Sequence, residues 1–126
     1  MTKEDDYRAI VDAVDRMVNR GDEADAVLRA VVELLLDRLD HVAWAGISLV
    51  EDSGLELGPS HGERASGSMS VVGIEYDGRK VGEIALESDE AGAFDKDDLG
   101  ALERIATLIS QHALVAWDTA GETWKP

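Results

Sequence analysis

The sequence predicts an α+β domain with a mainly antiparallel sheet, and three observations lead to that class. Two segments near the amino terminus and one near the carboxyl terminus repeat apolar residues at steps of three and four, the period of an amphipathic helix. Four segments between them alternate polar and apolar residues, the period of a strand. Two turn sequences, Asp52-Ser53-Gly54 and Asp77-Gly78, join these strands in pairs and predict two hairpins.

The two amino-terminal helices are separated by a short glycine turn. Residues 3–19 are predicted to form the first helix, with Thr2 as its N-cap. Gly21 is expected to end it, because glycine adopts a positive φ without strain. Asp22 is then expected to cap a second helix that runs to about Leu39.

The last helix is predicted to begin near Asp95, with Asp97 and Asp98 favourably placed at the positive end of its dipole. The length of the chain, 126 residues, suits one domain. We expect this domain to have a core at 22–118 and a loose tail at 119–126.

The sheet is predicted to hold about four to five strands, in the spatial order 55–61, 42–50, 80–88, 69–76, with the helices covering one face. The other face is expected to show the outward residues of these strands: Trp44, Ser48, Val71, Glu75, Glu83, Ala85 and Glu87.

Composition excludes several classes of function. The 27 acidic and 12 basic residues give a net charge of −15, which repels nucleic acids and anionic membranes. Such a surplus is also typical of proteins adapted to high salt. There is no cysteine, so disulfides, thiolate catalysis and thiolate metal sites are excluded. No signal peptide or transmembrane run is evident, and a cytoplasmic location is expected.

Three stretches carry a family resemblance. Residues 42–66 form a strand, a turn, a second strand and a loop; residues 68–88 form the hairpin with the Asp-Gly turn; residues 94–99 open the last helix. Over roughly residues 24–113, their order and spacing resemble the small GAF domains that reduce free methionine-R-sulfoxide. The resemblance implies a GAF fold.

The functional residues of that family are mostly missing. Ser66 stands where the resemblance places the first redox cysteine, and the segment that would hold the others and roof the pocket is absent between Ser66 and Ser68. Met69 and Ala85 stand where carboxylates bind the substrate, and Glu87 alone keeps the charge. A serine hydroxyl cannot replace a thiolate in attacking a sulfoxide. We therefore expect no catalytic residue, and no cofactor.

The candidate ligand or partner face comprises Trp44, Ser48, His61, Ser66, Val71 and Glu87. Trp44 aligns with a tryptophan that walls the ligand pocket in the resembling enzymes; alternatively it packs on Val71 or a partner chain. His61 is a candidate ligand or base, or else a solvated loop residue. Ser66 lacks a nearby base and is interpreted as a loop residue.

Other ionisable residues are weaker candidates. Glu75, Glu83 and Glu87 would do acid–base work if buried together, and would be an ordinary solvated face if exposed. His41 and His112 have no companions at metal-ligand spacing, so no metal site is expected.

The apolar stripes on residues 24–39 and 99–117 are wider than contact with one small sheet requires. They favour a homodimer formed through the terminal helices, as the resemblance also implies. The alternative is that the helix at 3–19 covers them.

Three hypotheses remain. The leading one is a non-catalytic GAF-like sensory or regulatory module with an unidentified small molecule or protein partner. The second is a divergent enzyme of the free methionine-R-sulfoxide reductase type. The third is a pure protein-interaction domain that uses the exposed sheet face, for which Trp44→Asp would abolish partner capture and leave the fold intact.

Overall fold

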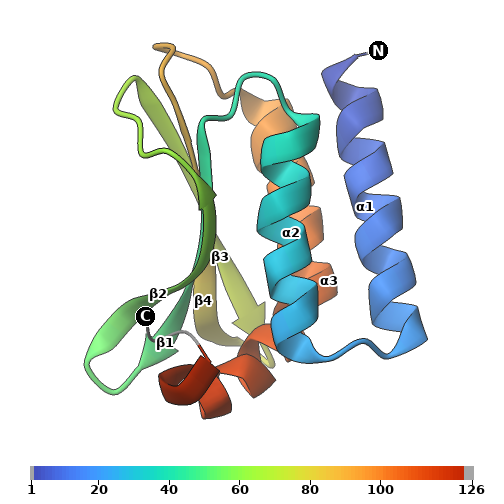
Figure 1. The fold of residues 1–126 in the computed structure, drawn as a ribbon, viewed down its shortest axis with the longest axis vertical. Coiled ribbons are helices and arrows are strands. Elements are labelled where there is room, and N and C mark those ends of the chain that lie inside the picture. Colours follow the sequence, from blue (N-terminus) through green and yellow to red (C-terminus); the bar gives the residue numbers. More distant parts are fainter. Residues whose placement is uncertain (1, 124–126) are drawn as a thin grey trace.

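The structure is a computed structural model that describes the backbone of residues 2–123 and the side chains of residues 2–115. Its elements are, in chain order, α1 (Lys3–Arg20), α2 (Ala24–Arg38), β1 (Trp44–Glu51), β2 (Gly54–Gly62), β3 (Ser68–Tyr76), β4 (Arg79–Ser88) and α3 (Lys96–Thr123). The predicted α+β class is confirmed. Four antiparallel strands form one sheet in the predicted order β2-β1-β4-β3, and the helices lie on one side of it (Figure 1).

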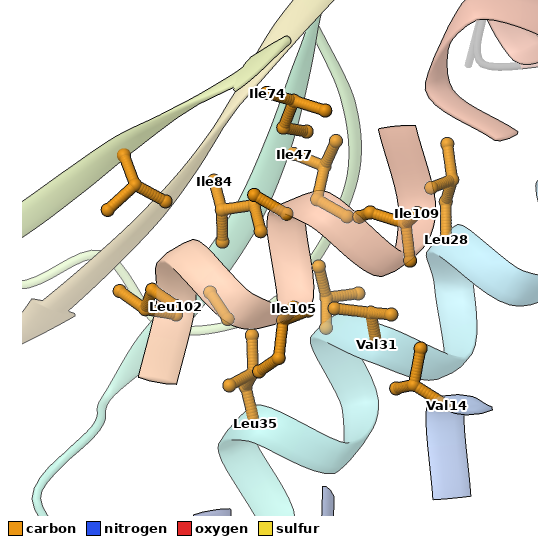
Figure 2. Close-up of a cluster of buried hydrophobic side chains, with 14 of the residues drawn as sticks. Val14, Leu28, Val31, Leu35, Ile47, Ile74, Ile84, Leu102, Ile105 and Ile109 are labelled. Carbon is orange, nitrogen blue, oxygen red and sulfur yellow. The ribbon is translucent and has the colours of Figure 1, made fainter. Parts of the chain in front are cut away.

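The molecule has three layers. Helices α2 and α3 pack directly on the sheet, and α1 lies against their outer side (Figure 1). Figure 2 shows how isoleucines from the sheet interleave with both inner helices. The fully buried core includes Ile47, Ile74 and Ile84 from the sheet, Leu102, Ile105 and Ile109 from α3, Leu28, Val31 and Leu35 from α2, and Val14 from α1. Among the described side chains, α1 covers much of the apolar surface that α2 and α3 turn away from the sheet, while Leu99 of the α3 stripe stays exposed.

The caps of α1 follow the prediction and the cap of α2 does not. Thr2 accepts a hydrogen bond from the backbone N–H of Asp5 in a capping box, and Gly21 ends the helix at φ 81°. The predicted cap at Asp22 is wrong. Glu23 occupies the N-cap position of α2 without a side-chain bond, while Asp22 forms a bidentate pair with Arg20.

Helix α3 begins where the sequence predicts, because the Asp95 carboxylate accepts hydrogen bonds from the backbone N–H groups of Asp97 and Asp98. Its backbone continues to Thr123, past the predicted boundary of the core at residue 118, so residues 119–123 of the expected tail are helical. The rest of that tail lies outside the described residues.

Two irregularities shape the sheet. Gly58 and Pro59 of β2 face the single residue Ile47 of β1, which is a bulge that accommodates the missing N–H of proline. At the predicted Asp-Gly turn, Asp77 and Gly78 both adopt positive φ, 53° and 78°, the geometry of a tight hairpin. Within the described part of the chain, no helix is both long and apolar enough to cross a membrane.

Candidate functional site

The face of the sheet that the helices leave open is built from aligned rows of residues. Register places Trp44 beside Glu87 and Met69, Gly46 beside Ala85 and Val71, and Ser48 beside Glu83 and Gly73. Because residues paired across strands share a face, six of the seven residues predicted for this face lie together in these rows. Most central positions carry small side chains.

Trp44 closes one end of this face, and its surroundings correct the expectation of an uncovered ring. The side chain is buried, with only 6% of the residue exposed. It lies so close over Gly46 that a Cβ at that position would overlap the ring carbons. The guanidinium of Arg64 stacks on the ring, with Cζ 4.2 Å from the ring centroid.

Arg64 also holds Glu87. Its Nε and Nη2 atoms donate to the two carboxylate oxygens at 3.0 and 2.7 Å, and the N–H of Ala65 donates to Oε1 at 2.8 Å. Glu87 is buried, so the expectation of a solvated carboxylate is wrong for this residue. Hydrogen bonds from Arg64 lower the pKa of Glu87 against the opposing effect of desolvation, and the carboxylate is therefore charged at neutral pH.

The segment that positions these groups is short. Only residues 63–67 separate β2 from β3, and this link carries Arg64 across the end of the sheet. Gly67 is required where the link turns into β3, because a Cβ there would collide with the backbone of Asp89. Where the resemblance implied a roofing segment, a single arginine covers the aromatic ring.

A shallow pocket of about 330 Å³ lies beside this cluster and is lined by Arg64, Ala65, Ser66, Glu87 and Asp89. Ser66 is exposed at the pocket. His61 does not join the site, because its register partner is Ala45, on the helix-facing side of the sheet. Ser48 and Val71 lie on the same face as Trp44, in rows away from the Arg64 cluster.

A second cluster, between the helices, was missed by sequence reasoning. Asp98 is fully buried and accepts hydrogen bonds from the Tyr7 hydroxyl at 2.6 Å, from Lys3 Nζ at 2.8 Å and from the N–H of Asp95 at 2.9 Å. His41 Nε2 lies 2.8 Å from Asp98 Oδ1, the same oxygen that accepts from Tyr7.

The donors decide the charge state of this second cluster. Burial alone would raise the pKa of Asp98, but the hydrogen bonds from Lys3 and Tyr7 outweigh it and hold that pKa well below its usual range. Burial and the Asp98 carboxylate together raise the pKa of Tyr7. No local pattern reveals such a cluster, because its members come from α1, the α2–β1 loop and α3.

Among the described side chains, no group of three or more His, Asp or Glu is arranged to hold a metal ion.

Comparison with solved structures identifies the class of the protein: it has the GAF fold. The sequence matches no protein-family model and no curated protein. Free methionine-R-sulfoxide reductase from Neisseria meningitidis, solved with its substrate, superposes with a TM-score of 0.78 at 19% identity over 95% of each chain.

Two further matches come from proteins described as GAF domains or sensors. A GAF domain of a phosphoenolpyruvate-protein phosphotransferase from Coxiella burnetii has a TM-score of 0.76 at 11% identity, over 95% of this chain and 99% of that one. A candidate GAF sensor protein from Burkholderia vietnamiensis has a TM-score of 0.74 at 20% identity, over 95% and 96%. These identities establish the fold alone, and the fold is shared by enzymes and sensors.

Proposed function

We propose that this chain is a non-catalytic GAF-fold sensory or regulatory module whose ligand site is the cluster of Trp44, Arg64 and Glu87. The observation that carries the proposal is that this site already holds a cation. An aromatic ring and a buried carboxylate are the two groups that proteins use to bind ammonium and guanidinium ions, and here the chain fills both with its own arginine.

Arg64 is suited to be displaced. Its side chain is 66% exposed and comes from the link 63–67, whereas Glu87 is fixed in the central strand β4. A ligand with an ammonium or guanidinium group would stack on Trp44 and pair with Glu87, while Arg64 moves into solvent. The movement of the link would carry the signal.

The kinship in fold supports a ligand of this kind. The Neisseria enzyme was solved in complex with its substrate, free methionine-R-sulfoxide, which is an amino acid and carries an ammonium group. Reduction of a sulfoxide through thiols needs a thiolate that attacks the sulfur and a second thiol that closes a disulfide. A chain without cysteine supplies neither group, which favours binding without turnover.

Binding measurements with matched variants test the proposal. L-Methionine-R-sulfoxide, L-methionine, L-arginine and choline would be titrated by calorimetry into the wild type, Arg64→Ala, Glu87→Gln and the control Arg79→Ala. Arg79 is an exposed arginine at the start of β4. We expect a cationic ligand to bind Arg64→Ala more tightly than the wild type, Glu87→Gln more weakly and Arg79→Ala unchanged. Failure of every compound to bind Arg64→Ala at millimolar concentration would contradict the proposal.

The enzyme hypothesis has its own test. Consumption of methionine-R-sulfoxide by the purified chain with thioredoxin, thioredoxin reductase and NADPH would establish a reductase that works without its own thiols. We expect no NADPH oxidation above the rate without the chain.

A sensory module also needs a surface that contacts its partner. The sequence favoured a homodimer formed through the terminal helices. In the structure α1 covers much of the stripes of α2 and α3, and among the described helical side chains the large apolar residues left exposed are Leu99 and Val115. A second copy remains the partner we propose, but the helix surface offers it little apolar area.

A further inference from the structure

The two outer strands of the sheet differ in how they avoid pairing with other strands. Natural edge strands are protected by proline, bulges and charges. Strand β2 has all three protections, in Pro59, the bulge at Gly58–Pro59 and Glu56. Strand β3 has none over most of its length: residues 65–74 contain no charge and no proline, in a chain of which 31% is charged.

Apolar side chains border the unprotected strand. Met69 and Val71 lie on the open face of the sheet and are 63% and 39% exposed. Val72 and Ile74, on the opposite face, are buried against the helices. Since β3 is last in the sheet order, no strand of the described chain pairs with its outer side. We call residues 68–74 of this strand the β3 edge.

We infer that the β3 edge is a homodimer interface, at which it pairs antiparallel with the β3 edge of a second copy. The two four-stranded sheets would join into one continuous sheet. This interface uses the outer edge of the sheet rather than the exposed surface of the terminal helices.

The net charge of the chain and the neutrality of the β3 edge favour a second copy of the chain as the binding partner. Two chains that each carry a charge of −15 repel one another over most of their surfaces, and they can approach most easily where neither presents a charge. A basic foreign segment would find no carboxylate to pair with between residues 65 and 74. The edge therefore suits an acidic partner that is neutral along one strand, which is the chain itself.

The geometry of the strand also selects a register. A two-fold axis perpendicular to the sheet keeps both helix layers on one side. Because residues that face each other across an antiparallel pair share a face, this axis must pass midway between the two copies of one residue. Centred on Val71, the pairing places Met69 opposite Gly73 of the second copy and Glu75 opposite Gly67 of the second copy. Gly73 has open space above it, because a Cβ there would meet only the end of the Lys80 side chain, at 4.0 Å. No like charges face each other in this register.

Single cysteines test the interface and its register together, since the native chain has none to interfere. In Val71→Cys the two thiols would face each other across the axis, at a Cα separation of about 4.5–5.5 Å that a disulfide can span. In Met69→Cys they would lie about 13 Å apart along the strands. Leu57→Cys, on the protected edge and 49% exposed, is the matched control.

Mild oxidation followed by non-reducing electrophoresis is expected to give a covalent dimer for Val71→Cys, with little for Met69→Cys and Leu57→Cys. Equal cross-linking of all three would indicate random collision and would overturn the inference. So would cross-linking at 57 or 69 in preference to 71.

A reversible measurement guards against trapping by the disulfide. Sedimentation velocity over a concentration series in high salt is expected to show a wild-type dimer, weakened about tenfold or more in Val71→Lys, where like charges meet at the axis, and unchanged in Leu57→Lys. Far-ultraviolet circular dichroism confirms that each variant is folded. A wild type that stays monomeric would overturn the interface, as would a dimer that survives Val71→Lys and is lost in Val115→Lys on α3.

Discussion

Two buried carboxylates, Asp98 and Glu87, hold cationic side chains in this fold, and they differ in what supplies the cation. Asp98 is enclosed by α1, the α2–β1 loop and α3, with donors from Lys3, Tyr7 and the backbone of Asp95. Glu87 accepts both of its charged hydrogen bonds from one exposed arginine, Arg64, on the five-residue link 63–67. The first arrangement joins three elements, whereas the second depends on one exposed side chain. We propose that a buried carboxylate serves structure at the first site and cation exchange at the second.

The largest difference between the two sites should appear in stability. Asp98→Asn removes a buried charge that several donors converge on, and we expect it to cost about 3 kcal/mol of the free energy of unfolding. Glu87→Gln keeps an acceptor for the N–H of Ala65 and frees only an exposed arginine, so about 1 kcal/mol is expected. Urea denaturation at neutral pH measures both. Equal losses would contradict the distinction.

Gly46 tests whether Trp44 is held in place by close packing. Gly46→Ala would push the ring from its position and expose Glu87, at an expected cost of about 2 kcal/mol. Gly73→Ala lies on the same face with open space around it and is the matched control, expected to change stability by less than about 0.5 kcal/mol. Thermal unfolding of the two variants checks the comparison, and a control as damaging as Gly46→Ala would show that the ring is not the cause.

Acid should weaken Asp98's cluster through its lowered pKa. The ordinary pKa of an aspartate, 3.8, describes the unfolded chain, and the folded value lies below it. The unfolded state therefore binds more protons in this range, so stability contributed by Asp98 is complete above about pH 5 and is lost as pH falls through 3.8 and lower. Denaturation at pH 7, 4 and 3 should show a steeper loss in the wild type than in Asp98→Asn. Parallel losses in the two would place the acid sensitivity elsewhere.

A small effect on stability is expected for the variant with the largest effect on binding. Arg64→Ala removes an exposed partner and should destabilise the fold less than Glu87→Gln does. The pKa of Glu87 should rise in this variant, because the hydrogen bonds from Arg64 are what lower it. Titration of the Glu87 carboxyl by carbon-detected NMR would show the rise. An unchanged pKa would mean that Ala65 alone stabilises the charge.

Local sequence patterns predicted the fold, but they did not predict the contacts between residues that are distant in the sequence. Alternation and the Asp77–Gly78 turn give strands whose pairing is local, which is why the strand order was predictable. Trp44 was chosen as a candidate site residue by resemblance, but Arg64 was not, because nothing in residues 63–67 shows that the link folds across the ring.

The Asp98 cluster was also not predicted, because its members are even farther apart in the sequence. Asp98 was predicted only as a residue at the positive end of the helix dipole, and it does lie in the first turn of α3. Its partners Tyr7 and His41 are 91 and 57 positions away, and only the packing of α1 on α3 brings Tyr7 to it. The cap at Asp22 was wrong because Arg20 competes for that carboxylate with the backbone.

If Arg64 occupies a site for an exchangeable cation, a free guanidinium ion should fill that site when the arginine side chain is removed. Ethylguanidinium at millimolar concentration would be titrated into Arg64→Ala while the indole N–H of Trp44 is followed by NMR. We expect a saturable shift of that signal, absent in the double variant with Glu87→Gln and much weaker in the wild type. A signal that stays unchanged in Arg64→Ala, or moves equally with and without Glu87, would contradict it.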